Sequence, residues 1–338
     1  MTGTNDQPLI DIHLHLAGNG CCGSGCWLSP ETEKRLSFRF LKLLNGITRE
    51  QMETRIDGDW AKRMHELVTS SRAGFGVALG FDGAYGHESG LKVQDKSQLI
   101  VPPEWVFRVC REHPGLLPGP SINPFRQDAL DLLDYCIEEG AVLLKWLPTA
   151  QGIDPDSPRI KRFYQKLADH RIPLLVHMGG ERTFREIDPR YNDVNLLHRP
   201  LEAGVRTIIA HSATPIALSG ERDQIPLLVD LLERYEHCYV DNSGMCNPAR
   251  FIHMRRLVRH PLIQSRTLYG SDWPVPSNAW YFLPWLGPLR IRRIESISNL
   301  IDRDLAIKEA MGYDPGTHRL AWQVLANLDR WTVKGAVS

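Results

Sequence analysis

The chain of 338 residues is long enough for one large hydrophobic core or for two domains. Its 40 Lys and Arg residues balance its 40 Asp and Glu residues, so net charge favours neither nucleic acid nor an anionic membrane as a partner. We therefore expect a small-molecule substrate. The N-terminal sequence has no signal-peptide pattern and no apolar run reaches roughly 18 residues, which predicts a cytoplasmic protein without a membrane span.

The chain contains seven cysteines, an odd number. Three of them lie within apolar or helical patterns, which favours a reduced compartment over a disulfide framework; they are Cys110, Cys136 and Cys238. Cys21, Cys22 and Cys26 lie instead in the glycine-rich segment GNGCCGSGCW. Two interpretations stay open for these three: flexible loop thiols, or an extra thiolate ligand folded over a nearby metal site.

Eight short apolar runs alternate with amphipathic stretches along the chain. The runs begin near residues 8, 74, 115, 140, 171, 204, 237 and 266. Continuous Val, Ile and Leu runs are typical of parallel strands buried on both faces, and segments such as DALDLLDYCIEEG and DQIPLLVDLLERYE predict helices between them. No GxGxxG motif follows the first run, which disfavours a dinucleotide-binding sheet. The sequence therefore predicts an α/β fold, a (β/α)8 or TIM barrel.

Two segments exceed what eight βα units require. Residues 18–73 separate the first two predicted strands by far more than one helix needs, so we expect a mostly helical insertion over the barrel mouth. Residues 283–338 follow the last predicted strand and are expected to form helices outside the barrel. No internal repeat, low-complexity tract or Pro/Ser-rich linker divides the chain, so residues 1–338 are predicted to form one domain.

The first predicted strand carries two histidines in the sequence Asp11-Ile12-His13-Leu14-His15. Residues two positions apart on a strand project from the same side, so His13 and His15 can bind one metal ion. Imidazole suits Zn²⁺ and other first-row metals. For this pair alone an alternative stays open, in which one histidine caps the strand and the other packs in the core.

Four further metal-competent residues lie where later apolar runs end, namely Lys145, His177, His211 and Asp272. The carboxyl ends of the strands of a (β/α)8 barrel meet at one mouth, where the active sites of this fold lie. Unrelated core residues have no reason to share this position. We therefore expect these four side chains and the histidine pair to surround one site.

This series of residues resembles the pattern of the amidohydrolase superfamily, which has HxH on strand one, Lys on strand four in some branches, His on strands five and six, and Asp on strand eight. The segments GSDWP and LEAGVRTIIAHS are similar to the branch that includes aminocarboxymuconate-semialdehyde decarboxylase. The likeness extends from Ile10 to about Pro276. The long segment after strand one and the lack of a clean Asn-Ala pair in the terminal helix depart from the family pattern. The resemblance therefore implies a fold and a metal site but no particular substrate.

The resemblance implies one divalent metal ion, most readily zinc, held by His13, His15, His177 and Asp272. It also implies a catalytic role for Asp272, because the corresponding carboxylate in related barrels takes the proton from the attacking water. A structural interpretation of Asp272 as a helix cap or turn residue stays open.

Two residues decide how many metal ions the resemblance implies. His211 either binds a second ion or acts off the metal as a general base or a substrate ligand. Lys145 is costly to bury as an isolated ammonium, and in binuclear relatives the corresponding lysine is carboxylated and bridges two ions. The alternative is an ordinary lysine that binds a substrate carboxylate or points outward. One ion and two ions are both compatible with the sequence.

Three residues that follow strand ends are candidates for substrate binding, Trp146, Arg182 and Trp273. The arginine suits an anionic group. Each of these side chains fits a packing or solvated role equally well. The turn at residues 241–243, which ends the seventh predicted strand, is a further candidate for a polar contact.

The leading hypothesis is a metal-dependent hydrolase that uses metal-activated water to cleave an amide, lactone or ester bond of a small molecule. The first alternative keeps the metal and changes the reaction to non-oxidative decarboxylation, as the decarboxylase branch implies. A non-catalytic metal-binding barrel is an alternative of another class, but it would require a broken ligand set, whereas every position of the pattern is filled. Homo-oligomers are common among such barrels, and the sequence leaves the oligomeric state open.

Overall fold

Eight strands with intervening helices form the centre of the computed structural model, which describes residues 7–316 and 319–332. Each strand falls within one of the eight apolar runs, so the predicted (β/α)8 barrel is confirmed. The strands are β1 (Ile10–His15), β3 (Phe75–Leu79), β5 (Leu116–Gly119), β6 (Leu144–Trp146), β7 (Leu174–His177), β8 (Thr207–Ala210), β9 (Cys238–Asp241) and β10 (Thr267–Leu268).

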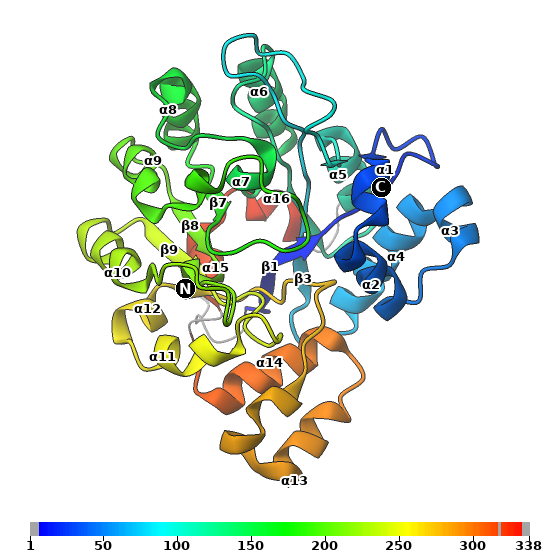
Figure 1. The fold of residues 1–338 in the computed structure, drawn as a ribbon, viewed down its shortest axis with the longest axis vertical. Coiled ribbons are helices and arrows are strands. Elements are labelled where there is room, and N and C mark those ends of the chain that lie inside the picture. Colours follow the sequence, from blue (N-terminus) through cyan, green and yellow to red (C-terminus); the bar gives the residue numbers. More distant parts are fainter. Residues whose placement is uncertain (1–6, 317–318, 333–338) are drawn as a thin grey trace.

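The strands pair in barrel order, in two parallel sheets that meet at two seams. One sheet has the order β1-β3-β5 and the other the order β10-β9-β8-β7-β6. At the seams the ladder is interrupted, but individual backbone hydrogen bonds cross the gap. Val142 donates to the carbonyl oxygen of Pro118 at 2.9 Å, and Ile12 donates to that of Tyr269 at 3.0 Å. The strands thus surround one interior, although their pairing is not continuous (Figure 1).

Amphipathic helices cover the outside of the strands (Figure 1). They are α4 (Ile56–Thr69), α5 (Pro103–Glu112), α6 (Ala129–Glu139), α8 (Lys161–Asp169), α9 (His198–Glu202), α10 (Ile225–Arg234), α11 (Met254–Val258) and α12 (Pro261–Ser265), and the short α7 (Pro148–Gln151) follows β6. In α10, Ile225, Leu228 and Leu232 are buried at the spacing of one helix face. No helix within residues 7–316 and 319–332 combines the length and the apolarity that a membrane span needs.

The segment between β1 and β3 forms the predicted, mostly helical insertion. Ahead of α4 it contains β2 (Trp27–Leu28) and the helices α1 (Pro30–Lys34), α2 (Leu36–Leu44) and α3 (Arg49–Thr54). Ser29 caps α1, and Thr48 forms a capping box with Gln51 at the start of α3. Strand β2 pairs antiparallel with β4 (Leu99–Ile100), so the insertion is tied to the loop that follows β3.

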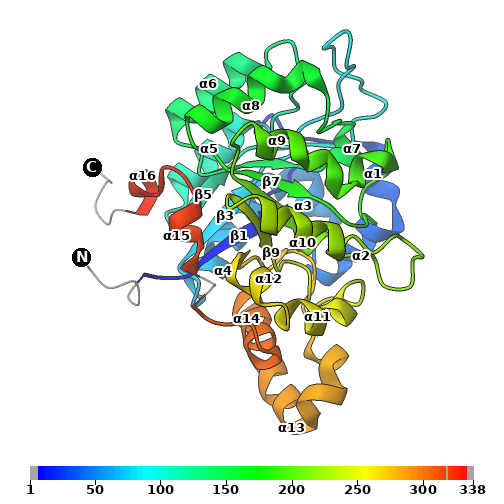
Figure 2. The same ribbon diagram turned by 90° about the vertical axis from the view of Figure 1, so that its left-hand side faces the viewer.

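The C-terminal segment contains α13 (Leu283–Glu295), α14 (Leu300–Met311), α15 (Ala321–Val324) and α16 (Leu328–Thr332). Helices α13 and α14 lie outside the strands (Figure 1). In contrast, α15 and α16 lie at the end of the barrel opposite to α1 and α2 (Figure 2). Ala321, Val324 and Leu328 join the interior cluster that includes Ile10 and Val77. The terminal helices therefore close the amino end of the barrel, while the insertion covers its carboxyl end.

An irregularity in β1 affects where its histidines point. Ile12 packs in the interior cluster, whereas Leu14 packs in a separate cluster outside the barrel. The register of β1 against β3 shifts between Asp11 and Leu14, as it does at a β-bulge. The shift allows His13 to follow Ile12 on the inner side, at the carboxyl end of the strand, where His15 also lies.

Candidate active site

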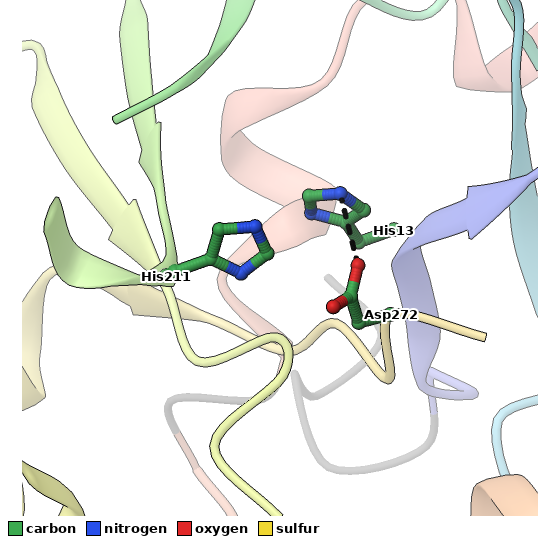
Figure 3. Close-up of side chains that lie close together, drawn as sticks. All are labelled: His13, His211 and Asp272. Atoms are coloured by element: carbon green, nitrogen blue, oxygen red, sulfur yellow. Dashed lines mark ion pairs between the residues drawn. The ribbon is translucent and has the colours of Figure 1, made fainter. Parts of the chain in front are cut away.

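Three metal-competent side chains point toward one another at the carboxyl ends of the strands (Figure 3). His13 comes from β1, His211 directly follows β8, and Asp272 follows β10. One potential ligand atom from each residue lies within 4.8 Å of the other two, and all three residues are buried. The Nε2 atom of His13 and the Oδ1 atom of Asp272 are 3.5 Å apart. In the part of the chain that the structure describes, this is the one group of three such residues.

Asp241, the last residue of β9, contacts both histidines of this group. Its Oδ2 atom lies 2.7 Å from Nδ1 of His13, and its Oδ1 atom accepts a hydrogen bond from the backbone N–H of His211 at 2.7 Å. The carbonyl oxygen of Ser243 lies 3.0 Å from Nδ1 of His211. Because an acceptor faces Nδ1 in each ring, that nitrogen carries the proton. The Nε2 lone pair of each ring is therefore available to a ligand.

Burial favours the neutral form of three imidazoles at this site. The pKa of His13, like those of His177 and His211, lies well below its ordinary value because burial penalises the charged ring. The positive charge of Lys145 lowers the pKa of His13 and of His177 further. Neutral imidazole is the form that binds a metal ion, so these rings are already in the state that a metal requires.

His15 and His177 lie beside the three clustered residues rather than among them. The Nε2 atom of His15 is 3.1 Å from Oδ1 of Asp272. The Nδ1 atom of His177 is 3.2 Å from Nε2 of His211. The sequence grouped these two histidines with His13 and Asp272 and left His211 as an option. The structure brings all of them together and places His211 in the most compact group.

Lys145 extends from β6 into the centre of the site. The residue is 2% exposed, and its Nζ atom lies 3.0 Å from Nε2 of His13. Burial lowers the pKa of Lys145 to about 8, although the nearby carboxylates of Asp241 and Asp272 act in the opposite direction. The amine thus contacts the same imidazole nitrogen that a metal ion would use. Its carboxylation and a bridging role stay predictions.

Unusual backbone conformations position two of the three clustered residues. The residues from His211 to Ala213 all have φ between 48° and 55°, and Asp272 has φ of 70°. Such conformations cost about 1–3 kcal/mol for a residue other than glycine and concentrate at functional sites. The backbone at Gly270 also lies close to the side chain of His13. A Cβ atom on Gly270 would be 2.7 Å from the Cβ atom of His13.

The donor set of this site fits a divalent metal ion of the zinc type. Two neutral imidazoles and one carboxylate are ligands that Zn²⁺ accepts, and three protein ligands leave a position for water, as in catalytic zinc sites. The carboxylate of Asp241 behind the His13 ring supplies the outer hydrogen bond that is typical of metal-binding histidines. The residues that would hold the ion are His13, His211 and Asp272, with His15 and His177 next to them.

A cavity of about 340 Å³ opens beside this group. Its polar end includes His15, His177, His211 and Asp272. Most of the remaining wall is apolar and is shared between the insertion and the barrel loops; it includes Phe38, Leu41, Trp60, Phe81, Leu147, Phe184 and Val275. A cavity of this size with a few polar groups at one end is typical of small-molecule sites.

Arg250 brings a buried positive charge to the same cavity. It is 4% exposed and lines the cavity. Its guanidinium donates to the carbonyl oxygens of Thr214 and Gly180 and to the Thr214 hydroxyl, and no carboxylate of the described residues forms an ion pair with it. Burial lowers the pKa of Arg250, but arginine stays charged in proteins. A buried guanidinium without a carboxylate partner suits an anionic group of a ligand.

The three predicted substrate-binding residues take different positions. Arg182 lines the cavity. Trp146 is fully buried, with its ring 5.8 Å from that of Tyr164. Trp273 stacks on Trp60, with 4.5 Å between the ring centres. Among the described residues, the two predicted tryptophans have packing positions outside the cavity lining, and their contribution to substrate binding stays a prediction.

A second layer of buried charges holds the turn that carries Asp272. Lys308 of α14 is fully buried, donates to the carbonyl oxygen of Gly270 at 2.7 Å and pairs with Asp304. Asp11 of β1 accepts a hydrogen bond at 2.9 Å from the backbone N–H of the residue after Gly270. Helix α14 and strand β1 therefore fix this turn together.

Comparison with protein families matches residues 10–314 to the family described as Amidohydrolase. This range covers most of the chain and contains every residue of the site. The chain therefore belongs to the amidohydrolase family, and the resemblance predicted from the sequence is confirmed. A comparison with curated proteins gives no match.

Solved structures bear out the barrel fold. An uncharacterised TIM-barrel protein from Bordetella bronchiseptica is similar over 89% of this chain and 99% of its own, with a TM-score of 0.55 and 16% identity. A protein from Pseudomonas putida, provisionally named a 2-pyrone-4,6-dicarboxylic acid hydrolase, is similar over 96% of each chain, with a TM-score of 0.53 and 15% identity. A 2,6-dihydroxybenzoate decarboxylase from Rhizobium is similar over 94% of this chain and 99% of its own, with a TM-score of 0.50 and 13% identity. At these identities the likeness establishes the fold and not the reaction.

We expect Lys308→Met to lower the free energy of unfolding by about 3–5 kcal/mol, because Asp304 would remain as a buried charge without its partner. The double variant Lys308→Met, Asp304→Leu removes both charges and should recover much of this loss, as measured by urea denaturation. It still lacks the donor to the Gly270 carbonyl oxygen, so its metal affinity should stay below that of the unaltered protein. Equal metal affinity in the two proteins would contradict a positioning role for Lys308.

Proposed function

We propose that this protein is a metal-dependent hydrolase that cleaves an amide, lactone or ester bond of a small molecule. The main support is the meeting of His13, His211 and Asp272 at the polar end of an apolar cavity. A divalent ion held there, for which zinc is the best candidate, would supply Lewis acidity and a nucleophilic water near neutral pH. The apolar wall of the cavity would keep bulk water away from the reacting bond.

Asp272 is the proposed general base of the reaction. Its carboxylate lines the cavity, with Oδ1 beside the rings of His15 and His13, where it can accept a proton from the attacking water. His211 also lines the cavity and is held by Ser243 and Asp241. We assign to His211 either a place among the metal ligands or a role off the metal as a general base or a substrate ligand.

The proposed substrate has an apolar body and an anionic group. The aromatic and aliphatic wall of the cavity fits the apolar body. Arg250 and Arg182 line the same cavity, as does Glu181, and within the described part of the chain no carboxylate forms an ion pair with Arg250. The provisional name of the Pseudomonas putida protein, a dicarboxylic acid hydrolase, agrees with an acidic substrate.

Non-oxidative decarboxylation is the second candidate function. One structural neighbour is a dihydroxybenzoate decarboxylase, and Arg250 would serve equally well to bind an acid that loses CO₂. Both reactions would use the same metal-site residues, so the products must distinguish them.

The proposed reaction is tested by product analysis in isotopically heavy-oxygen water with metal-replete protein and a panel of amides, lactones, esters and carboxylic acids. Hydrolysis should place one heavy oxygen atom in the acid product without release of CO₂, and Asp272→Asn should lower kcat by about 100- to 10,000-fold because the base is lost. Release of CO₂ without heavy oxygen in the organic product would replace hydrolysis by decarboxylation. No turnover of any compound would contradict both.

We expect Arg250→Met to raise KM for an acidic substrate by about 10- to 100-fold, because a hydrogen-bonded charge is lost, with a smaller change in kcat. Arg250→Lys keeps the charge but lacks the planar fork of donors, so it should recover part of the affinity. The matched control is an uncharged derivative of the same substrate. A rise in KM of the same size for the uncharged compound would show that Arg250 does not bind the anionic group.

A further inference from the structure

Two adjacent cysteines lie near the start of the insertion, outside the lining of the cavity at the candidate active site. Cys21 and Cys22 are the central residues of a turn in which the N–H of Gly23 donates to the carbonyl oxygen of Gly20 at 3.2 Å. Their sulfur atoms are 3.4 Å apart. Cys22 is exposed and Cys21 is partly exposed, so a ligand from solution can reach the pair.

The separation of the two sulfur atoms fits a shared ligand atom better than a disulfide. A disulfide bond is about 2.05 Å long and usually joins residues whose Cα atoms are about 4.4–6.8 Å apart, whereas adjacent Cα atoms are only about 3.8 Å apart. Trivalent arsenic is pyramidal and has narrower S–As–S angles than a tetrahedral zinc ion, for which two bonds of about 2.3 Å to sulfur hold the sulfur atoms roughly 3.8 Å apart. The observed 3.4 Å is much closer to this value than to a bond.

Asp57 holds this turn in shape. The residue is fully buried near the start of α4. Its carboxylate accepts hydrogen bonds from the N–H groups of Asn19 at 2.7 Å and Gly20 at 3.0 Å, and Cys21 Sγ donates to the same carboxylate at 3.7 Å. The thiol pair is therefore presented by an anchored turn, and the carboxylate is an additional donor beside it.

We propose that Cys21 and Cys22 form a dithiol site for thiophilic ligands, represented by trivalent arsenicals. With an arsenical of the form R–As(OH)₂, two As–S bonds form and two As–O bonds break. The two thiol protons leave with the two hydroxyl groups as two water molecules, and no atom changes its oxidation state. This site is separate from the candidate metal centre, which has imidazole and carboxylate donors.

The remaining cysteines are poor competitors for such a ligand. All five are buried: Cys26, Cys110, Cys136, Cys238 and Cys246. Burial raises the pKa of each of these thiols and that of Cys21 as well, so access from solution is what distinguishes the pair from the other five. We therefore expect one arsenical per chain.

The test uses phenylarsine oxide on the full, metal-loaded chain, followed by intact-mass measurement. One adduct is expected on the unaltered protein and on Cys26→Ser, the matched control, and no stable adduct on Cys21→Ser or Cys22→Ser. Thermal melting by circular dichroism establishes that each variant is folded. No adduct on the unaltered protein, an adduct that persists in folded Cys22→Ser, or its loss in folded Cys26→Ser would overturn the proposal.

Metal content is measured in the same samples. It should be the same before and after the arsenical binds, because the dithiol shares no ligand with the candidate metal centre. Displacement of the metal by the arsenical would overturn the assignment of a separate site. The adduct count does not depend on turnover, so failure here and failure of the proposed hydrolase activity are distinguishable.

Discussion

The buried carboxylate of Asp241 is the constraint on which the candidate site depends. One of its oxygen atoms faces the ring of His13 and the other accepts a hydrogen bond from the backbone of His211, so a single side chain holds a residue of β1 and the residue that follows β8. The side chain is fully buried, and these hydrogen bonds, together with those from Ser243, offset the cost of removing its oxygen atoms from water. Its position also fixes the protonated nitrogen of His13 and thereby leaves the opposite lone pair for a ligand.

The strand order of the fold could be predicted because each barrel strand is buried on both faces and therefore forms a continuous apolar run. The insertion was predictable in extent, since residues 18–73 are too many for one crossover. The position of α15 and α16 could not be predicted, because an apolar pattern such as RLAWQVLANL shows that a segment is buried but not which surface it covers. The register shift in β1 has no sequence signal either.

The site residues at strand ends could be predicted because strand position and chemistry coincide there. Alternation along a strand also places Lys145 and Trp146 on opposite faces, so the outward packing of Trp146 was implicit in the inward position of the lysine. His211 lies closest to His13 and Asp272 because of side-chain torsions and the strained backbone after β8. Neither of these can be predicted from a sequence pattern. Arg250 lies in a loop, and its approach to the cavity follows from the path of that loop.

The buried guanidinium of Arg250 and the apolar cavity form a coherent enzyme site with the candidate metal centre only if the metal is present. The most direct test is the metal content per chain, measured by elemental mass spectrometry on protein purified without chelators, for the unaltered protein and for His13→Ala and Lys145→Ala. We predict about one to two equivalents of a first-row metal in the unaltered protein and a loss in His13→Ala. If the metal content falls from two equivalents in the unaltered protein to fewer in Lys145→Ala, Lys145 bridges two ions. If both proteins contain one equivalent, Lys145 has no bridging role. No metal in the unaltered protein, even after zinc is supplied, would contradict the candidate metal centre and the proposed reaction with it.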